Sequence, residues 1–195
     1  MKKRIKLIIT LFFLSIILTN CKSSTKLYKN GDKNKIKASV LNDSTYIAVK
    51  DFLAKKATQK IKDTIIIEYS YNNENCWNLL DEKRQEYIKS FILKHNLNTQ
   101  LLSSTRPTIS YFSYKEPGEN FNKIKKWDKT IKLDSTKTLL NLLFKERAIC
   151  GTSAMILPDQ KVITILSDSH HEILNLNKTE VSKILIQKNK YSLYS

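Results

Sequence analysis

The first twenty-one residues constrain this 195-residue chain most, because they set how much of it is left to fold. Met1–Lys6 is a basic head, and Leu7–Thr19 is an uncharged apolar run. A positive head followed by about 13 such residues is typical of a secretory signal and is short for a finished membrane-spanning helix. We therefore expect export, with residues 1–20 acting as a signal peptide outside the folded domain.

The end of this run resembles the lipobox of bacterial lipoproteins. Leu18 and Thr19 precede Asn20 and Cys21, which matches the family's aliphatic residue three positions before a cysteine, although the family usually has Gly, Ala or Ser where Asn20 stands. The resemblance implies that Cys21 carries acyl chains such as palmitate and anchors the protein in the cell envelope, on the non-cytoplasmic side of a membrane. Two alternatives are an uncleaved N-terminal anchor, which also leaves the domain tethered, and a plain signal peptide cut elsewhere.

The charge of the chain bears on its partners. Its 34 basic and 18 acidic residues give a formal net charge of +16, but only four of the basic residues are arginines. Recognition of phosphates and bases favours the planar arginine fork, and the lysines here are spread over the whole chain. We expect a dispersed, solvated basic surface and no nucleic-acid partner, with loose attraction to an anionic membrane surface as the alternative.

Composition divides the exported part into two segments. Residues 21–43 comprise Cys21 and a polar stretch without sustained periodicity, which is typical of a flexible tether. Residues 44–195 are enough for one compact core and too few for two ordinary domains. We expect a single α/β domain held off a membrane.

Periodicity predicts an alternation of helices and strands along residues 44–195. A helix follows the capping pair Asp43-Ser44, and two short apolar runs around Pro158–Gln160 predict a hairpin. The expected elements are helices over about 46–61, 77–94, 120–127, 136–144 and 178–188, and strands over 64–71, 108–114, 130–133, 153–157 and 162–166. This order predicts a sheet in which parallel pairing gives way to an antiparallel hairpin.

The order, with two local patterns, resembles the thioredoxin-like fold over roughly residues 60–190. The apolar strand pattern at 65–71 runs through a short polar loop to Cys76, where the family has a nucleophilic cysteine at the start of a helix. Cys150 and Gly151 then precede a strand, turn and strand, as the family's cis-proline loop does. Three departures are that Cys76 has Leu79 rather than Cys three positions on, that Thr152 stands about where the proline would be, and that Gln160 replaces a turn glycine.

The resemblance implies a role for the two remaining cysteines. In the thioredoxin-like arrangement Cys76 would feel the dipole of a helix and act as nucleophile, and Cys150 would act as resolving thiol, with Gly151 and Thr152 in the substrate loop. The partner would be a protein thiol or disulfide. Two alternatives stay open, a structural bridge and two unpaired buried thiols. The competing function is a non-catalytic binding or scaffolding lipoprotein on the same fold.

Other polar groups have simpler interpretations. The adjacent His170 and His171 lie in a polar segment with Glu172, and neighbouring side chains point apart, so we expect no metal site there. Asp81-Glu82 is expected to complement the dipole at the start of a helix rather than to form a catalytic pair. No phosphate-binding glycine loop or Ser-His-Asp spacing is recognisable, and the sequence predicts no cofactor.

Overall fold

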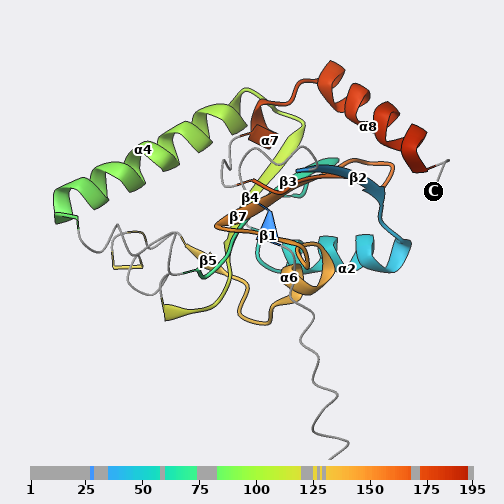
Figure 1. Ribbon diagram of the computed structural model, residues 1–195. Coiled ribbons are helices and arrows are strands. Elements are labelled where there is room, and N and C mark those ends of the chain that lie inside the picture. The colour runs from blue at the N-terminus through green and yellow to red at the C-terminus, as the bar shows by residue number, and fades with distance from the viewer. Residues whose placement is uncertain are drawn as a thin grey trace, which may run out of the picture.

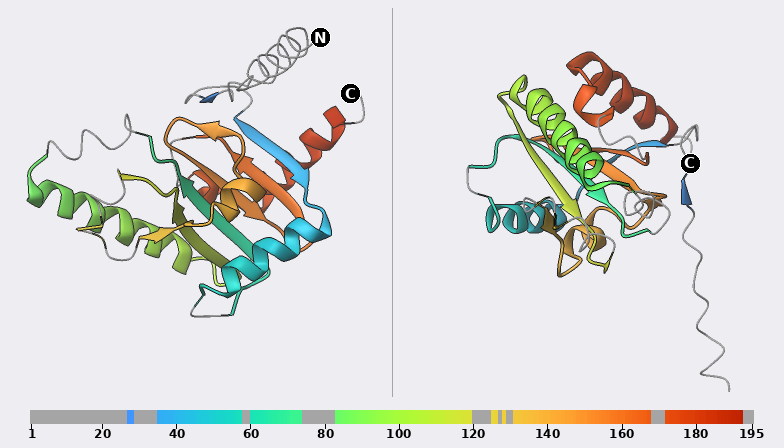
Figure 2. Two further views of the ribbon diagram at one scale, coloured as in Figure 1. Left: turned by 90° about the horizontal axis from the view of Figure 1, so that it is seen from below. Right: turned by 90° about the vertical axis from the view of Figure 1, so that its left-hand side faces the viewer.

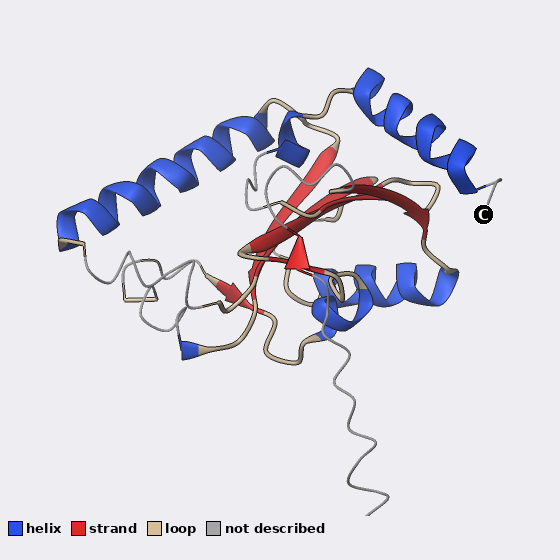
Figure 3. Ribbon diagram, viewed as in Figure 1, coloured by secondary structure: helices blue, strands red, loops and turns tan. Residues whose placement is uncertain are grey.

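The computed structural model describes residues 27–28, 35–57, 60–73, 83–119, 125–126, 128, 131–167 and 172–192. Figure 1 shows a central sheet with helices on both sides, and Figure 3 separates the strands from the helices that cover them. No helix within the described ranges is long and apolar enough to cross a membrane.

Six strands form one mixed sheet in the order β2-β8-β7-β3-β4-β5. β3 pairs in parallel with β4 and antiparallel with β7, β4 and β5 are parallel, and β8 is antiparallel to both β7 and β2. Their bounds are β2 Ile36–Val40, β3 Thr64–Ser70, β4 Ile109–Lys115, β5 Lys132–Leu133, β7 Gly151–Ile156 and β8 Lys161–Ile165. The expected α/β class, with a mixed sheet flanked by helices, is confirmed.

β3 is central because its side chains are apolar on both faces. Ile65 and Ile67 pack into one hydrophobic core and Ile66 into another, and all three are at most 1% exposed. A continuous apolar run is what a strand covered on both faces requires. The two cores lie on opposite faces of the sheet, because successive side chains of a strand alternate between its faces.

The helices form a layer on each face of the sheet (Figure 2). α2 (Asp43–Ala54) and α6 (Thr138–Leu142) cover the face of Ile65 and Ile67. α4 (Gln85–Ser104), α7 (Glu172–Asn175) and α8 (Lys178–Ser192) lie on the face of Ile66. The result is a three-layer α/β arrangement with the sheet in the middle.

The helix starts show local capping chemistry. Asn42, one residue before the expected cap, accepts a hydrogen bond from Thr45 N at 2.8 Å and caps α2. At α6 the buried Asp134 takes this role, because its carboxylate accepts from the backbone N–H groups of Thr138 at 2.9 Å and Leu140 at 3.0 Å.

Part of the expected tether belongs to the sheet. Ile36–Val40 form β2, which pairs along its whole length with β8. Leu27–Tyr28 form β1, which pairs in parallel with β6 (Arg147–Ala148) in a separate two-stranded sheet. An edge strand such as β2 buries few side chains, so the sequence of β2 lacks the continuous apolar run that predicts β3. Residues 27–28 and 36–40 of the expected tether are therefore strands.

α4 differs most from its expected range. The structure describes it over Gln85–Ser104, whereas the sequence predicted a helix ending near Lys94; residues 74–82, and Cys76 with them, lie outside the described residues. The helix continues because no breaker occurs before Pro107, which disfavours helical geometry in the residue ahead of it. Its outer face carries Leu93, Leu97 and Leu101, each at least 55% exposed.

The hairpin is confirmed, as β7 and β8 joined by a turn. Gln160 adopts a left-handed φ of 65° at this turn, where a glycine would be unstrained. Its backbone N–H donates to Leu157 O at 3.0 Å, and its side chain donates to Asp43 at 2.8 Å. These contacts hold the turn against the start of α2.

Candidate functional site

The candidate site lies where β3 and β4 end and β7 begins. Cys150 immediately precedes β7, and the backbone N–H of Tyr71, just after β3, donates to the carbonyl of Cys150 at 2.9 Å. Gly151 and Thr152 are buried within β7, so they lie in the sheet and not on an exposed loop. Cys150 is thereby held beside the segment that leaves β3.

The segment leaving β3 is tied to the strand start by a second contact. The side chain of Asn73 donates to the carbonyl of Ile149 at 3.0 Å. Cys76 and Cys21 lie outside the described residues, as do Asp81, Glu82, His170 and His171. The pairing of Cys76 with Cys150 and the lipidation of Cys21 stay predictions.

Tyr71 organises the loop ahead of Cys150. Its hydroxyl donates to the carbonyl of Glu146 at 2.9 Å and lies 3.0 Å from the hydroxyl of Thr152. The ring is fully buried, and burial raises the pKa of Tyr71, which keeps the hydroxyl a donor. One side chain therefore joins the end of β3 to both sides of Cys150.

We expect Tyr71→Phe to lower the free energy of unfolding by about 2 kcal/mol, because the buried hydroxyl of Thr152 and the part-buried carbonyl of Glu146 would lose their partner. Urea unfolding followed by circular dichroism measures the loss. The matched control is Tyr87→Phe on α4, where the ring is 54% exposed and a change within about 0.5 kcal/mol is expected. Equal effects of the two variants would contradict the organising role of Tyr71.

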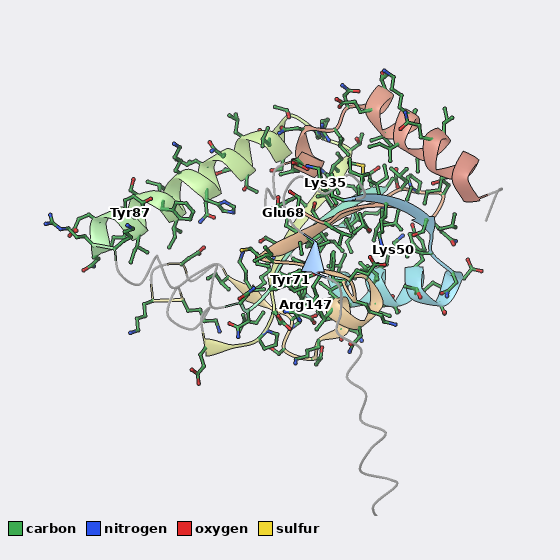
Figure 4. All side chains as sticks on the ribbon, viewed as in Figure 1. Lys35, Lys50, Glu68, Tyr71, Tyr87 and Arg147 are labelled. Atoms are coloured by element: carbon green, nitrogen blue, oxygen red, sulfur yellow. The ribbon has the colours of Figure 1, made fainter. Side chains whose placement is uncertain are left out.

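An ion pair closes the same end of the sheet. Glu116, directly after β4, accepts two hydrogen bonds from the guanidinium of Arg147, at 2.9 and 2.5 Å. It also accepts from the backbone N–H of Asn72 at 2.9 Å, and the guanidinium lies 4.3 Å from the centre of the Tyr71 ring. Figure 4 shows Arg147 beside Tyr71. The pair links β4, the segment after β3 and β6 around Cys150.

A second polar cluster lies within the sheet, on the face that α4 covers. Glu68 in the middle of β3 is 2% exposed and accepts a hydrogen bond from the hydroxyl of Tyr111 at 2.5 Å. Burial raises the pKa of Glu68 to about 7, against the opposing effects of the Tyr111 hydrogen bond and the charge of Lys115. Burial also lowers the pKa of Lys115, whose amine donates to Ser70 at 2.8 Å.

This second cluster places a carboxyl that titrates near neutral pH beside a lysine amine. Perturbed ionisable groups of this kind occur at functional sites and in structural networks alike. Glu68 and Lys115 lie on the opposite face from Tyr71, because Glu68 and Tyr71 are three positions apart along an extended chain. The two clusters therefore lie on opposite faces of the same sheet.

Sequence reasoning missed several of these residues. Glu68 did carry a signal, since its carboxyl is the one charged group in the otherwise uncharged run of β3. Glu116 and Arg147 carried none, because they are separated by 31 positions and meet only through the sheet.

The described residues contain no group of three or more His, Cys, Asp or Glu side chains that could hold a metal ion. Glu172, considered with the two histidines, pairs with Lys35 at 2.7 Å. A scan of protein-family models and searches of curated proteins and of solved structures found no match to this chain.

Proposed function

We propose that this protein is a membrane-tethered lipoprotein of the cell envelope that exchanges thiols and disulfides through Cys76 and Cys150. One observation carries the proposal: β7 pairs with β3 in a register that sets Ser70 opposite Gly151 and Tyr71 against Cys150. Cys76 follows Asn73 by three residues, so the Cα atoms of Cys76 and Asn73 lie within about 11 Å of each other. Asn73 contacts Ile149, the residue before Cys150, and the short chain distance to Cys76 therefore favours a reaction between the sulfurs of Cys76 and Cys150.

The arrangement of strands supports a thioredoxin-like domain as the scaffold. The parallel pair β3–β4 lies next to the antiparallel hairpin β7–β8, as the resemblance in sequence implies. β2 and β5 extend this unit at its two edges. Cys150 precedes the first strand of the hairpin, which is the position that the resemblance gives to the loop facing the nucleophile.

The proposed location rests on the first twenty-one residues. The basic head, the apolar run and Cys21 together favour export and lipid anchoring on the non-cytoplasmic side of a membrane. Envelope compartments outside the cytoplasm permit disulfides, so an exchange reaction has substrates there.

The proposed reaction has two steps. The Cys76 thiolate attacks one sulfur of a substrate disulfide, forming a mixed disulfide and releasing the other substrate sulfur as a thiolate. The Cys150 thiolate then attacks the Cys76 sulfur, which releases the second substrate thiolate and leaves a Cys76–Cys150 disulfide. The substrate gains two electrons, and a dithiol donor must return two electrons to the protein. The reverse sequence oxidises a substrate dithiol.

A second function, non-catalytic binding or scaffolding, is favoured by two observations. The sequence Cys76-Trp-Asn-Leu79 lacks a resolving cysteine three positions on. In the described ranges no peptide bond is cis, and the hydroxyl of Thr152 faces Tyr71 within the protein. Under this alternative the two cysteines form a permanent bridge or remain unreactive thiols.

Differential alkylation of the full chain in neutral detergent distinguishes the two functions. The protein is equilibrated in glutathione buffers of stepped potential, and mass spectrometry reports the oxidation of Cys76 and Cys150 separately from that of Cys21. Exchange predicts that both titrate together between about −270 and −120 mV. A bridge that resists reduction to below about −300 mV, or two thiols that never pair, supports the binding function.

A turnover assay provides the control. With dithiothreitol as reductant and insulin as disulfide substrate, Cys76→Ser should abolish the rate that the protein adds, and Cys150→Ser should trap a mixed disulfide. Ser153→Ala, three positions after Cys150 in β7, changes no sulfur and should retain the rate. Unaltered turnover in Cys76→Ser would rule out the proposed nucleophile.

A further inference from the structure

The outer edge of β4 is covered over only part of its length. β4 pairs with β3 from Ile109 to Lys115, but on its other side β5 pairs with Tyr114 and Lys115 alone. The N–H of Ile109 is used by a turn to Arg106, so Ser110–Ser113 is the stretch with no strand on its outer side among the described residues. An uncovered strand edge is a template for another extended chain.

Two open pockets lie along this edge. One has a volume of about 360 Å³ and the other about 420 Å³. Both are lined by Tyr111, Phe112, Ser103 and Lys132, so the pockets adjoin as one groove. We call it the β4 groove. Residues of α4 form one side of the groove, and Ala57, Lys60 and Lys62 line its other side.

The β4 groove suits an extended peptide. Alternate residues of a strand turn their N–H and C=O groups to the same side, so the four-residue edge offers the backbone groups of about two residues. The two sides of the groove lie on opposite faces of the sheet, because Ala57 packs against one hydrophobic core and α4 packs against the other. A strand added beyond β4 would therefore enter between two layers of side chains, as strands within the sheet do.

The charge around the β4 groove selects the chemistry of the peptide. Lys60, Lys62 and Lys132 line it and are exposed, and Lys115 lies at the end where β5 begins. Asp128 is the only acidic residue that the structure describes among the lining side chains. The excess of cations complements carboxylates, and the strand edge requires a polypeptide backbone, which a nucleic acid lacks.

We propose that the β4 groove binds an extended acidic segment of a partner protein, which adds to the sheet as a strand beyond β4 and sets carboxylates against Lys60, Lys62 and Lys132. Backbone hydrogen bonds supply affinity in this mode of recognition, and the side chains supply selectivity. The inference does not depend on Cys76 or Cys150, and it holds or fails independently of thiol exchange.

The test uses the full chain in neutral detergent and three fluorescent peptides of about eight residues, the length of an ordinary strand. The first alternates Glu and Thr, the second alternates Lys and Thr, and the third is the Glu peptide with alternate backbone nitrogens methylated. Fluorescence anisotropy should show binding of the first, with the other two weaker by about tenfold or more. Failure of the first peptide to bind overturns the proposal, as does equal binding of the methylated peptide.

Charge reversals locate the site. Lys62→Glu and Lys132→Glu should each weaken binding of the Glu peptide by about five- to tenfold, because they place like charges in the groove. Lys183→Glu on α8 changes the net charge equally at an exposed position away from the β4 groove and should leave binding unchanged. An equal loss in Lys183→Glu, or full competition by inorganic polyphosphate, would indicate unspecific attraction to a basic surface and would refute the strand-addition site.

Discussion

Glu116→Ala is expected to lower the free energy of unfolding by about 3 kcal/mol, the range found when one partner of a buried ion pair is removed. The side chain of Glu116 is 9% exposed and that of Arg147 is 29% exposed, so water replaces the lost carboxylate only partly. The substitution also removes a hydrogen bond, because the backbone N–H of Asn72 donates to a carboxylate oxygen of Glu116 at 2.9 Å. Urea unfolding monitored by tryptophan fluorescence gives the loss.

Asp159→Ala is the control for this experiment, because Asp159 pairs with Lys161 at the surface, where the side chains are 53% and 39% exposed. Exposed pairs contribute little, and we expect a change within about 0.5 kcal/mol. The double variant Glu116→Ala/Arg147→Met should recover part of the loss, since it no longer leaves a guanidinium unpaired. If Glu116→Ala costs no more than Asp159→Ala, the ion pair does not stabilise this end of the sheet.

Stability should fall as pH rises from about 4.5 to 7 because of Glu68. Its pKa is raised from 4.5 to about 7 in the folded protein, mainly by burial. The folded state therefore binds the proton more tightly than the unfolded state across this window, and the contribution is complete below pH 4.5 and lost above pH 7. At 1.36 kcal/mol per pKa unit, the change amounts to about 3 kcal/mol.

Glu68→Gln isolates this contribution from those of other groups. The amide resembles the protonated carboxyl, so the variant should match the wild type near pH 4.5 and become more stable than the wild type by up to about 3 kcal/mol near pH 7.5. Unfolding curves at each pH give the difference directly. Glu86→Gln at the exposed start of α4 should instead run parallel to the wild type throughout. A constant difference between Glu68→Gln and the wild type would show that Glu68 does not titrate in this window.

Local patterns predicted the elements that bury many side chains. The run at 64–70 is β3 because β-branched residues pack on both of its faces, and the turn at 158–160 joins β7 and β8 as expected. The same reasoning missed β2, since Ile36–Val40 sits at a sheet edge and needs little apolar surface. Helix ends were least predictable: α4 extends to Ser104, ten residues beyond its expected end.

The candidate site was predictable only in part. Gly151 and Thr152 were expected in a loop ahead of a strand over 153–157, with Cys150 beside them, but β7 begins at Gly151 and includes both residues. Tyr71, Glu116 and Arg147 were not expected around them, because no periodicity in a sequence links residues that meet across paired strands. The carboxylate of Glu116 could pair with many basic residues along the chain, and the strand register brings Arg147 to it.

The sequence by itself determined the type of the elements that bury many side chains, such as β3 and the hairpin strands β7 and β8, since the spacing of apolar residues must match the period of the element that buries them. It also determined the basic, apolar and cysteine-terminated start on which the proposed location rests. Only the tertiary structure decided the strand order, the register that places Tyr71 against Cys150, the burial of Glu68, and the short β5 that leaves the β4 groove open. These features depend on pairings between distant segments, whose energies arise from the assembled sheet and not from any local run of residues.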